Sequence, residues 1–152
     1  MTFGVEAWRA IVGAVAGLLY GCVLAILSLG AAGGGHGTLI PLLLSSAPLS
    51  VFYLVADADA GETALLAMLF GGSLVWVVLG WLVARTGHRM RLAASLLVLH
   101  YVSGLALVVA TGATLRGLAG EIPDFFKIWA PVYLLGQVAL WWRISKQTRP
   151  TV

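Results

Sequence analysis

AIVGAVAGLLYGCVLAILSLG, residues 10–30, is an apolar run without a single charged side chain. A helix needs about 20 such residues to cross the hydrocarbon core of a bilayer. Hydrocarbon offers no water to backbone N–H and C=O groups, so these groups must pair within a helix. The run is longer than the core of a secretory signal peptide, which has about 7–15 residues. It therefore predicts a membrane-spanning helix that is retained in the protein.

Three further apolar runs follow along the chain, at 63–84, 92–112 and 125–142. Lys127 is the only lysine, arginine, aspartate or glutamate in all four runs. The 152-residue chain is 61% hydrophobic and 10% charged, whereas soluble domains carry about 25% charged residues. The sequence therefore predicts an all-α integral membrane protein, with residues 1–152 forming one bundle of four transmembrane helices.

The segment between the first and second runs is apolar but interrupted. GGGHGT at 33–38 precedes an uncharged stretch, 39–56, which contains Pro41, Pro48 and three serines. Pro48 would remove a helix hydrogen bond in the middle of a crossing, and irregular backbone at membrane depth needs protein or water to cover it. We predict a Gly/Pro-rich re-entrant segment here, with a fifth crossing as the alternative.

Basic residues indicate the orientation, because cytoplasmic loops are enriched in lysine and arginine. Four crossings with the amino terminus inside place seven of them in the cytoplasm: Arg9, Arg85, Arg89, Arg91, Arg143, Lys146 and Arg149. Five crossings with the amino terminus outside move only Arg9, so the side of that terminus stays open. Both arrangements place the carboxyl terminus in the cytoplasm, and we expect a membrane of the bacterial plasma-membrane type. Basic clusters that flank apolar runs do not indicate nucleic-acid binding.

Gly13, Gly17 and Gly21 are spaced by four residues within the first run. This spacing places them on one face of a helix. Missing side chains let another helix approach closely, and such faces drive helix association in lipid. The partner is either another helix of the same chain or a second copy of the protein in a homo-oligomer.

His100 is the most prominent single residue of the third run. Ionisable groups inside membranes are costly and usually face the bundle interior. Ser103 lies one turn further along, and a count of 1.5 Å per residue puts Tyr133 at a similar depth, with Gln137 one turn nearer the cytoplasm. Tyr133 or Gln137 could bond one imidazole nitrogen and leave the other free. We predict either a hydrogen-bonded structural histidine or a ligand-binding or proton-handling site.

His36 lies in the glycine-rich turn after the first run. The turn is either a tight loop or a binding loop at the outer membrane face, since successive N–H groups can form an anion-binding nest. Together His36 and His100 could ligate a haem, but only a deeply re-entrant loop would bring them together.

The remaining motifs do not indicate chemistry. No serine–histidine–acid set shares one membrane layer, and no metal-ligand spacing is present, so we assign neither catalytic residues nor a metal site. The leading hypothesis is a binding or assembly module whose partner is the lipid bilayer. The alternatives are a small transporter or proton-conducting protein that uses His100 and the His36 loop, and a membrane redox protein with b-type haem.

Overall fold

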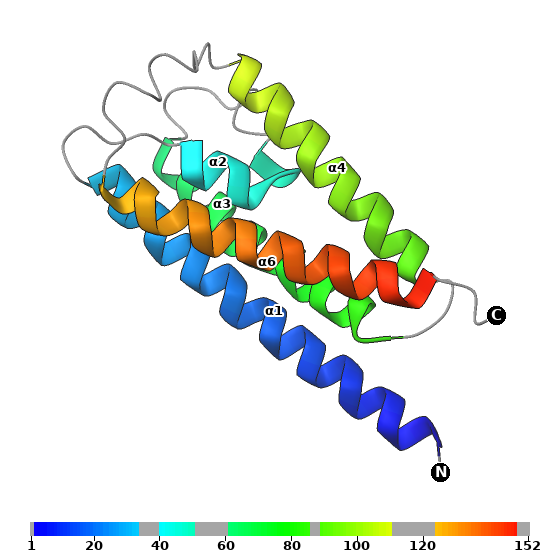
Figure 1. Ribbon diagram of the computed structural model, residues 1–152. Coiled ribbons are helices and arrows are strands. Elements are labelled where there is room, and N and C mark those ends of the chain that lie inside the picture. Colours follow the sequence, from blue (N-terminus) through cyan, green and yellow to red (C-terminus); the bar gives the residue numbers. More distant parts are fainter. Residues whose placement is uncertain (1, 34–39, 51–60, 86–88, 111–123, 149–152) are drawn as a thin grey trace.

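The computed structural model describes residues 2–33, 40–50, 61–85, 89–110 and 124–148 (Figure 1). The described residues form helices, with no strand among them. The helices are α1 (Thr2–Gly33), α2 (Ile40–Ser46), α3 (Gly61–Val83), α4 (Arg89–Ala110) and α6 (Asp124–Thr148). The all-helical prediction is therefore confirmed for this part of the chain. Each of the four apolar runs corresponds to one long helix, except that Ala84 lies just beyond α3 and residues 111–112 of the third run lie outside the described residues.

Two of the long helices extend well beyond the apolar runs that predicted them. α1 begins at Thr2 instead of Ala10, and α6 continues past Trp142 to Thr148. Arg143 and Lys146 lie in the last turns of α6, where cations interact favourably with the negative end of the helix dipole. Hydrophobicity located the helices, but polar helix ends add turns that an apolar run does not include.

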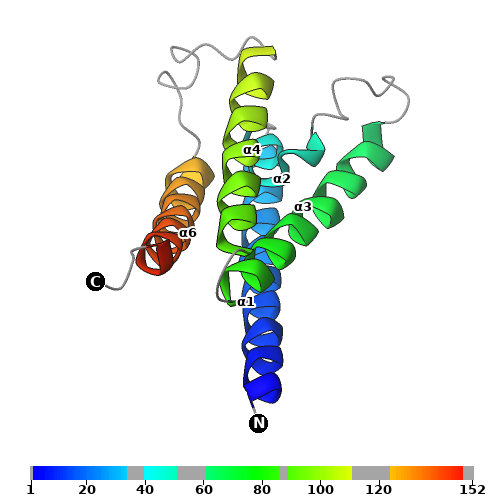
Figure 2. The same ribbon diagram turned by 90° about the vertical axis from the view of Figure 1, so that its right-hand side faces the viewer.

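Consecutive long helices run in opposite directions. The first residues of α1 and α4 lie at the same end of the molecule as the last residues of α3 and α6, and Figure 2 shows the tilt of α3 across α1 (Figures 1 and 2). We refer to this end, which carries both termini of the described chain, as the basic end, because it carries Arg9, Arg89, Arg143 and Lys146.

Gly13, Gly17 and Gly21 of α1 pack closely against the backbone of α3, and we call this interhelical contact the seam. A side chain at Gly13 would overlap the Gly80 carbonyl, one at Gly17 would overlap the Trp76 carbonyl, and one at Gly21 would lie 2.9 Å from the Ser73 Cα. Positions rise along α1 as they fall along α3, so the two helices cross antiparallel. The glycine face of α1 thus packs against a helix of the same chain.

The short helix α2 lies inside the bundle and contacts α1, α3, α4 and α6. Pro41 occupies its first turn, where a missing N–H costs nothing. The helix ends at Ser46, two residues before Pro48, as expected because the residue before a proline avoids the helical region. Seven residues span about 10 Å. α2 alone is therefore too short to cross a bilayer. Residues 39 and 51–56 of the predicted segment, and residues 34–38 of the glycine-rich turn before it, lie outside the described residues.

Large apolar side chains cover the outside of α1, α4 and α6. Examples that are more than half exposed are Leu19, Ile26, Val102, Leu105, Leu135 and Val138. Two of the described helices have stretches long and apolar enough to cross a membrane, Gly4–Gly30 and Arg89–Leu107, and only 22% and 39% of these stretches is buried inside the structure. Extended apolar surfaces of this kind mark contact with a protein or a membrane.

Candidate functional site

His100 connects three helices through its imidazole ring. Nδ1 lies 2.8 Å from the carbonyl oxygen of Ala47, just after α2, and Nε2 lies 2.6 Å from the Tyr133 hydroxyl on α6. A carbonyl can only accept, so Nδ1 carries the proton and Nε2 accepts from the tyrosine. The hydrogen bond between His100 and Tyr133 agrees with the depths counted from the sequence. The nitrogen that the sequence leaves free, Nδ1, is hydrogen-bonded to the carbonyl oxygen of Ala47.

Aromatic rings surround this histidine and keep it 1% exposed. The rings of Trp76, Tyr101 and Tyr133 have centroids 5.0, 5.6 and 5.9 Å from the imidazole. The Trp76 indole N–H donates to the Ser45 carbonyl at 3.0 Å, which gives α2 a second anchor. The cluster therefore holds α2 in place from α3, α4 and α6 together.

Gln137 and Ser103 do not bond the imidazole of His100. Gln137 accepts a 2.8 Å hydrogen bond from the Tyr101 hydroxyl through Oε1, and Trp141 donates to the same hydroxyl at 3.1 Å. Ser103 donates to carbonyls of its own helix, those of Leu99 and His100. The hydrogen bonds of the Tyr101 hydroxyl with Gln137 and Trp141 join α4 to α6, whereas the hydroxyl of Ser103 bonds only within α4.

These contacts support a structural role for His100. An axial haem ligand needs a free ring nitrogen, and both nitrogens of His100 are hydrogen-bonded. The second histidine of that hypothesis, His36, lies outside the described residues. The arrangement does not fit haem ligation, and the observed geometry favours a clamp on α2.

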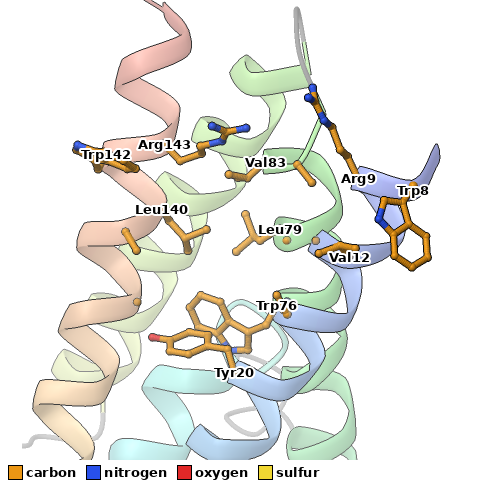
Figure 3. A pocket seen from close by; sticks show the side chains of 17 residues that line it. Trp8, Arg9, Val12, Tyr20, Trp76, Leu79, Val83, Leu140, Trp142 and Arg143 are labelled. Carbon is orange, nitrogen blue, oxygen red and sulfur yellow. The ribbon is translucent and has the colours of Figure 1, made fainter. Parts of the chain in front are cut away.

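A crevice of about 950 Å³ lies between the α1–α3 pair and α6. Figure 3 shows Arg9 and Arg143 at one end of it and Tyr20 and Trp76 at the other (Figure 3). Between these ends the walls consist of aliphatic side chains and glycines, including Val12, Leu79, Val83 and Leu140. Ligand pockets of proteins typically measure about 300–1,000 Å³. The crevice is therefore large enough for a ligand and is mainly apolar.

Small residues create this space. Ala16, Gly80, Gly136 and Ala139 line the crevice, and none of them has a side chain larger than a methyl group. At the floor the Tyr20 ring lies directly against Gly136, where an added Cβ would overlap the ring. The Tyr20 hydroxyl donates to the Tyr133 carbonyl at 2.8 Å and so fixes the floor to α6.

The basic end of the crevice combines cations with tryptophans. Trp8 and Trp142 line the crevice near Arg9 and Arg143. Lys146 lies 3.9 Å from the centre of the Trp142 ring, a cation–π contact. Tryptophan and basic residues concentrate where a bilayer meets water. This composition is typical of the headgroup level of a membrane.

The pairing of His100 with Tyr133 could be predicted from the sequence, but the crevice could not. Arg9 and Arg143 are 134 positions apart along the chain and resemble separate topology signals. The sequence contains one indication of the crevice: Arg9 and Arg143 each flank an apolar run that has small residues one to three turns away. Only the packing of α6 against α1 shows that these small residues face the same space.

The geometry defines a class: a protein whose described residues are helical, with two helices long and apolar enough for a membrane and an apolar crevice with a basic rim. Comparisons of the chain with protein-family models, with curated proteins and with solved structures found no match.

Proposed function

We propose that the chain is a membrane-embedded bundle in which α1, α3, α4 and α6 cross the bilayer and α2 is re-entrant. The outward apolar side chains of α1, α4 and α6 support this arrangement, as does the apolar stretch Phe70–Val83 of α3. A backbone that ends at membrane depth needs protein around it, and α2 is enclosed by all four long helices. The positive charge at the basic end supports a cytoplasmic location for that end.

We further propose that the protein is a lipid-binding module, whose crevice holds a hydrocarbon chain of a membrane lipid. The observation that supports this function is the crevice of about 950 Å³ with aliphatic walls and an aromatic floor. In a bilayer such a space does not fill with water, because its walls offer few hydrogen-bonding groups. Lipid chains surround the bundle and are the most abundant apolar occupant.

Photo-crosslinking tests chain binding. The protein is reconstituted with phosphatidylcholine that carries a diazirine in one acyl chain, and labelled residues are mapped by mass spectrometry. We expect labelling of Tyr20 and Leu140 in the crevice to exceed that of Leu105 and Val109, which are exposed on α4. Equal labelling per residue at both places contradicts the proposal.

A crevice-filling variant provides the matched control. Ala139→Phe places a benzyl group in the crevice and is expected to reduce crevice labelling at least fivefold, because the ring occupies the space of the chain. Ala106→Phe makes the same change on the exposed outer side of α4, away from the crevice, and should leave labelling unchanged. An identical effect of both variants would show that the crosslinking reports general lipid contact.

A further inference from the structure

Two arginines line the same end of the crevice from opposite walls, and no acid lines the crevice with them. Arg9 belongs to α1 and Arg143 to α6, so opposite walls each contribute one guanidinium at the same end (Figure 3). Among the described residues that line the crevice there is no aspartate or glutamate. The positive charge at the rim is therefore not neutralised by the crevice wall and can interact with an anion.

The depth of the crevice corresponds to one lipid leaflet. From Arg9 to Tyr20, eleven residues of α1 rise about 16 Å. Half of the hydrocarbon core is about 15 Å. A lipid whose chain ends near Tyr20 and Trp76 thus has its headgroup level with the arginines and with Trp8 and Trp142.

We propose that the crevice selects a phospholipid with a net negative headgroup, held with its phosphate between Arg9 and Arg143. This inference rests on the proposed function, since it requires the chain to occupy the crevice. Guanidinium groups present forks of N–H donors that match phosphate oxygens. A zwitterionic lipid would bring its own cation to a rim that already carries two, and no carboxylate lines the crevice to receive it. An anionic headgroup meets no such repulsion.

The test compares two lipids that differ only in the headgroup. Phosphatidylglycerol and phosphatidylcholine with the same diazirine-bearing chain are each added in trace amount to phosphatidylcholine vesicles that contain the full-length protein. A basic residue near the membrane surface attracts anionic lipid about fivefold. We expect phosphatidylglycerol to label Tyr20 and Leu140 at least fivefold more than phosphatidylcholine does.

Variants separate the rim from the general surface charge. Arg9→Gln with Arg143→Gln should lower the labelling ratio to about one and leave phosphatidylcholine labelling intact. Arg91→Gln, an exposed position of α4 at the same end but outside the crevice, should keep the ratio. Unfolding midpoints show whether each variant is folded, and the wild-type ratio stands independently of them.

The outcomes distinguish the two proposals. Crevice labelling by both lipids in equal amount overturns headgroup selection and leaves chain binding intact. Absence of crevice labelling by either lipid overturns both. A loss of selectivity in Arg91→Gln as large as that in the rim variant overturns the role of Arg9 and Arg143, because it would show that the overall charge attracts the lipid.

Discussion

Gly17→Leu is expected to force α1 away from α3 and to lower the free energy of unfolding by about 3 kcal/mol, the upper end of the cost of overpacking. At Gly17 the obstacle is the backbone of α3 at Trp76. A backbone cannot change rotamer, so the whole helix must move. Gly13, one turn before Gly17 on α1, is likewise packed against the backbone of Gly80. A shift of α1 at Gly17 therefore loosens the entire seam. The loss is measured by unfolding the purified protein in mixed detergent–dodecyl sulfate micelles.

Gly4→Leu is the matched control for this variant. Gly4 belongs to the same helix, and an added Cβ there meets nothing within 4 Å. The same substitution at Gly4 should change the free energy of unfolding by less than about 0.5 kcal/mol, as is usual for surface positions. If Gly17→Leu is as mild as Gly4→Leu, α1 and α3 do not pack along the glycines.

His100→Leu is expected to release α2 from the bundle at a cost of about 2–4 kcal/mol. The leucine fills most of the space but leaves two buried groups, the Ala47 carbonyl and the Tyr133 hydroxyl, without the partners they now have. A buried polar group that loses its partner costs about 1–3 kcal/mol. In membranes the cost per bond lies toward the lower end, because other partners form in the unfolded state.

Two further variants rank the contacts of His100. Tyr133→Phe removes one hydrogen bond and should cost about 1 kcal/mol. Ser103→Ala, one turn away on α4, should cost less than about 0.5 kcal/mol, because its hydroxyl donates only to carbonyls of its own helix. Equal stability of His100→Leu and Ser103→Ala would contradict the clamp. Measurement of unfolding in mixed micelles, under identical conditions for all three variants, gives the order.

Local spacing was enough to predict the seam face and the depth of the histidine. Gly13, Gly17 and Gly21 share a face because four residues make about one turn, and His100 meets Tyr133 because helices of equal rise place them at one level. The partner Gly80 could not be chosen in advance, since α3 also offers Gly71 and Gly72. Of these, Gly72 packs against Ser46 of α2, and its added Cβ would lie 2.7 Å from the serine Cβ.

The remaining features depend on tertiary packing. Ala47 reaches His100 only because α2 folds into the bundle, and no periodicity in seven residues specifies that position. The crevice is a volume left by Ala16, Gly136 and Ala139 between helices that are distant in sequence. A sequence pattern records which side chains are small, but the space they leave appears only after the helices are placed together.

The central claim is that the outer surface of this bundle contacts lipid, and the chain's one cysteine tests it without any substitution. Cys22 lies in the middle of α1 and is exposed, next to Gly21, which faces α3. A nitroxide attached to Cys22 in phosphatidylcholine vesicles is exposed to dissolved oxygen and to a water-soluble nickel chelate in turn, and spin relaxation reports collisions with each. We predict frequent collisions with oxygen and rare ones with nickel, as for a label near the centre of a bilayer. Frequent collisions with nickel would place this face of α1 in water and contradict the account.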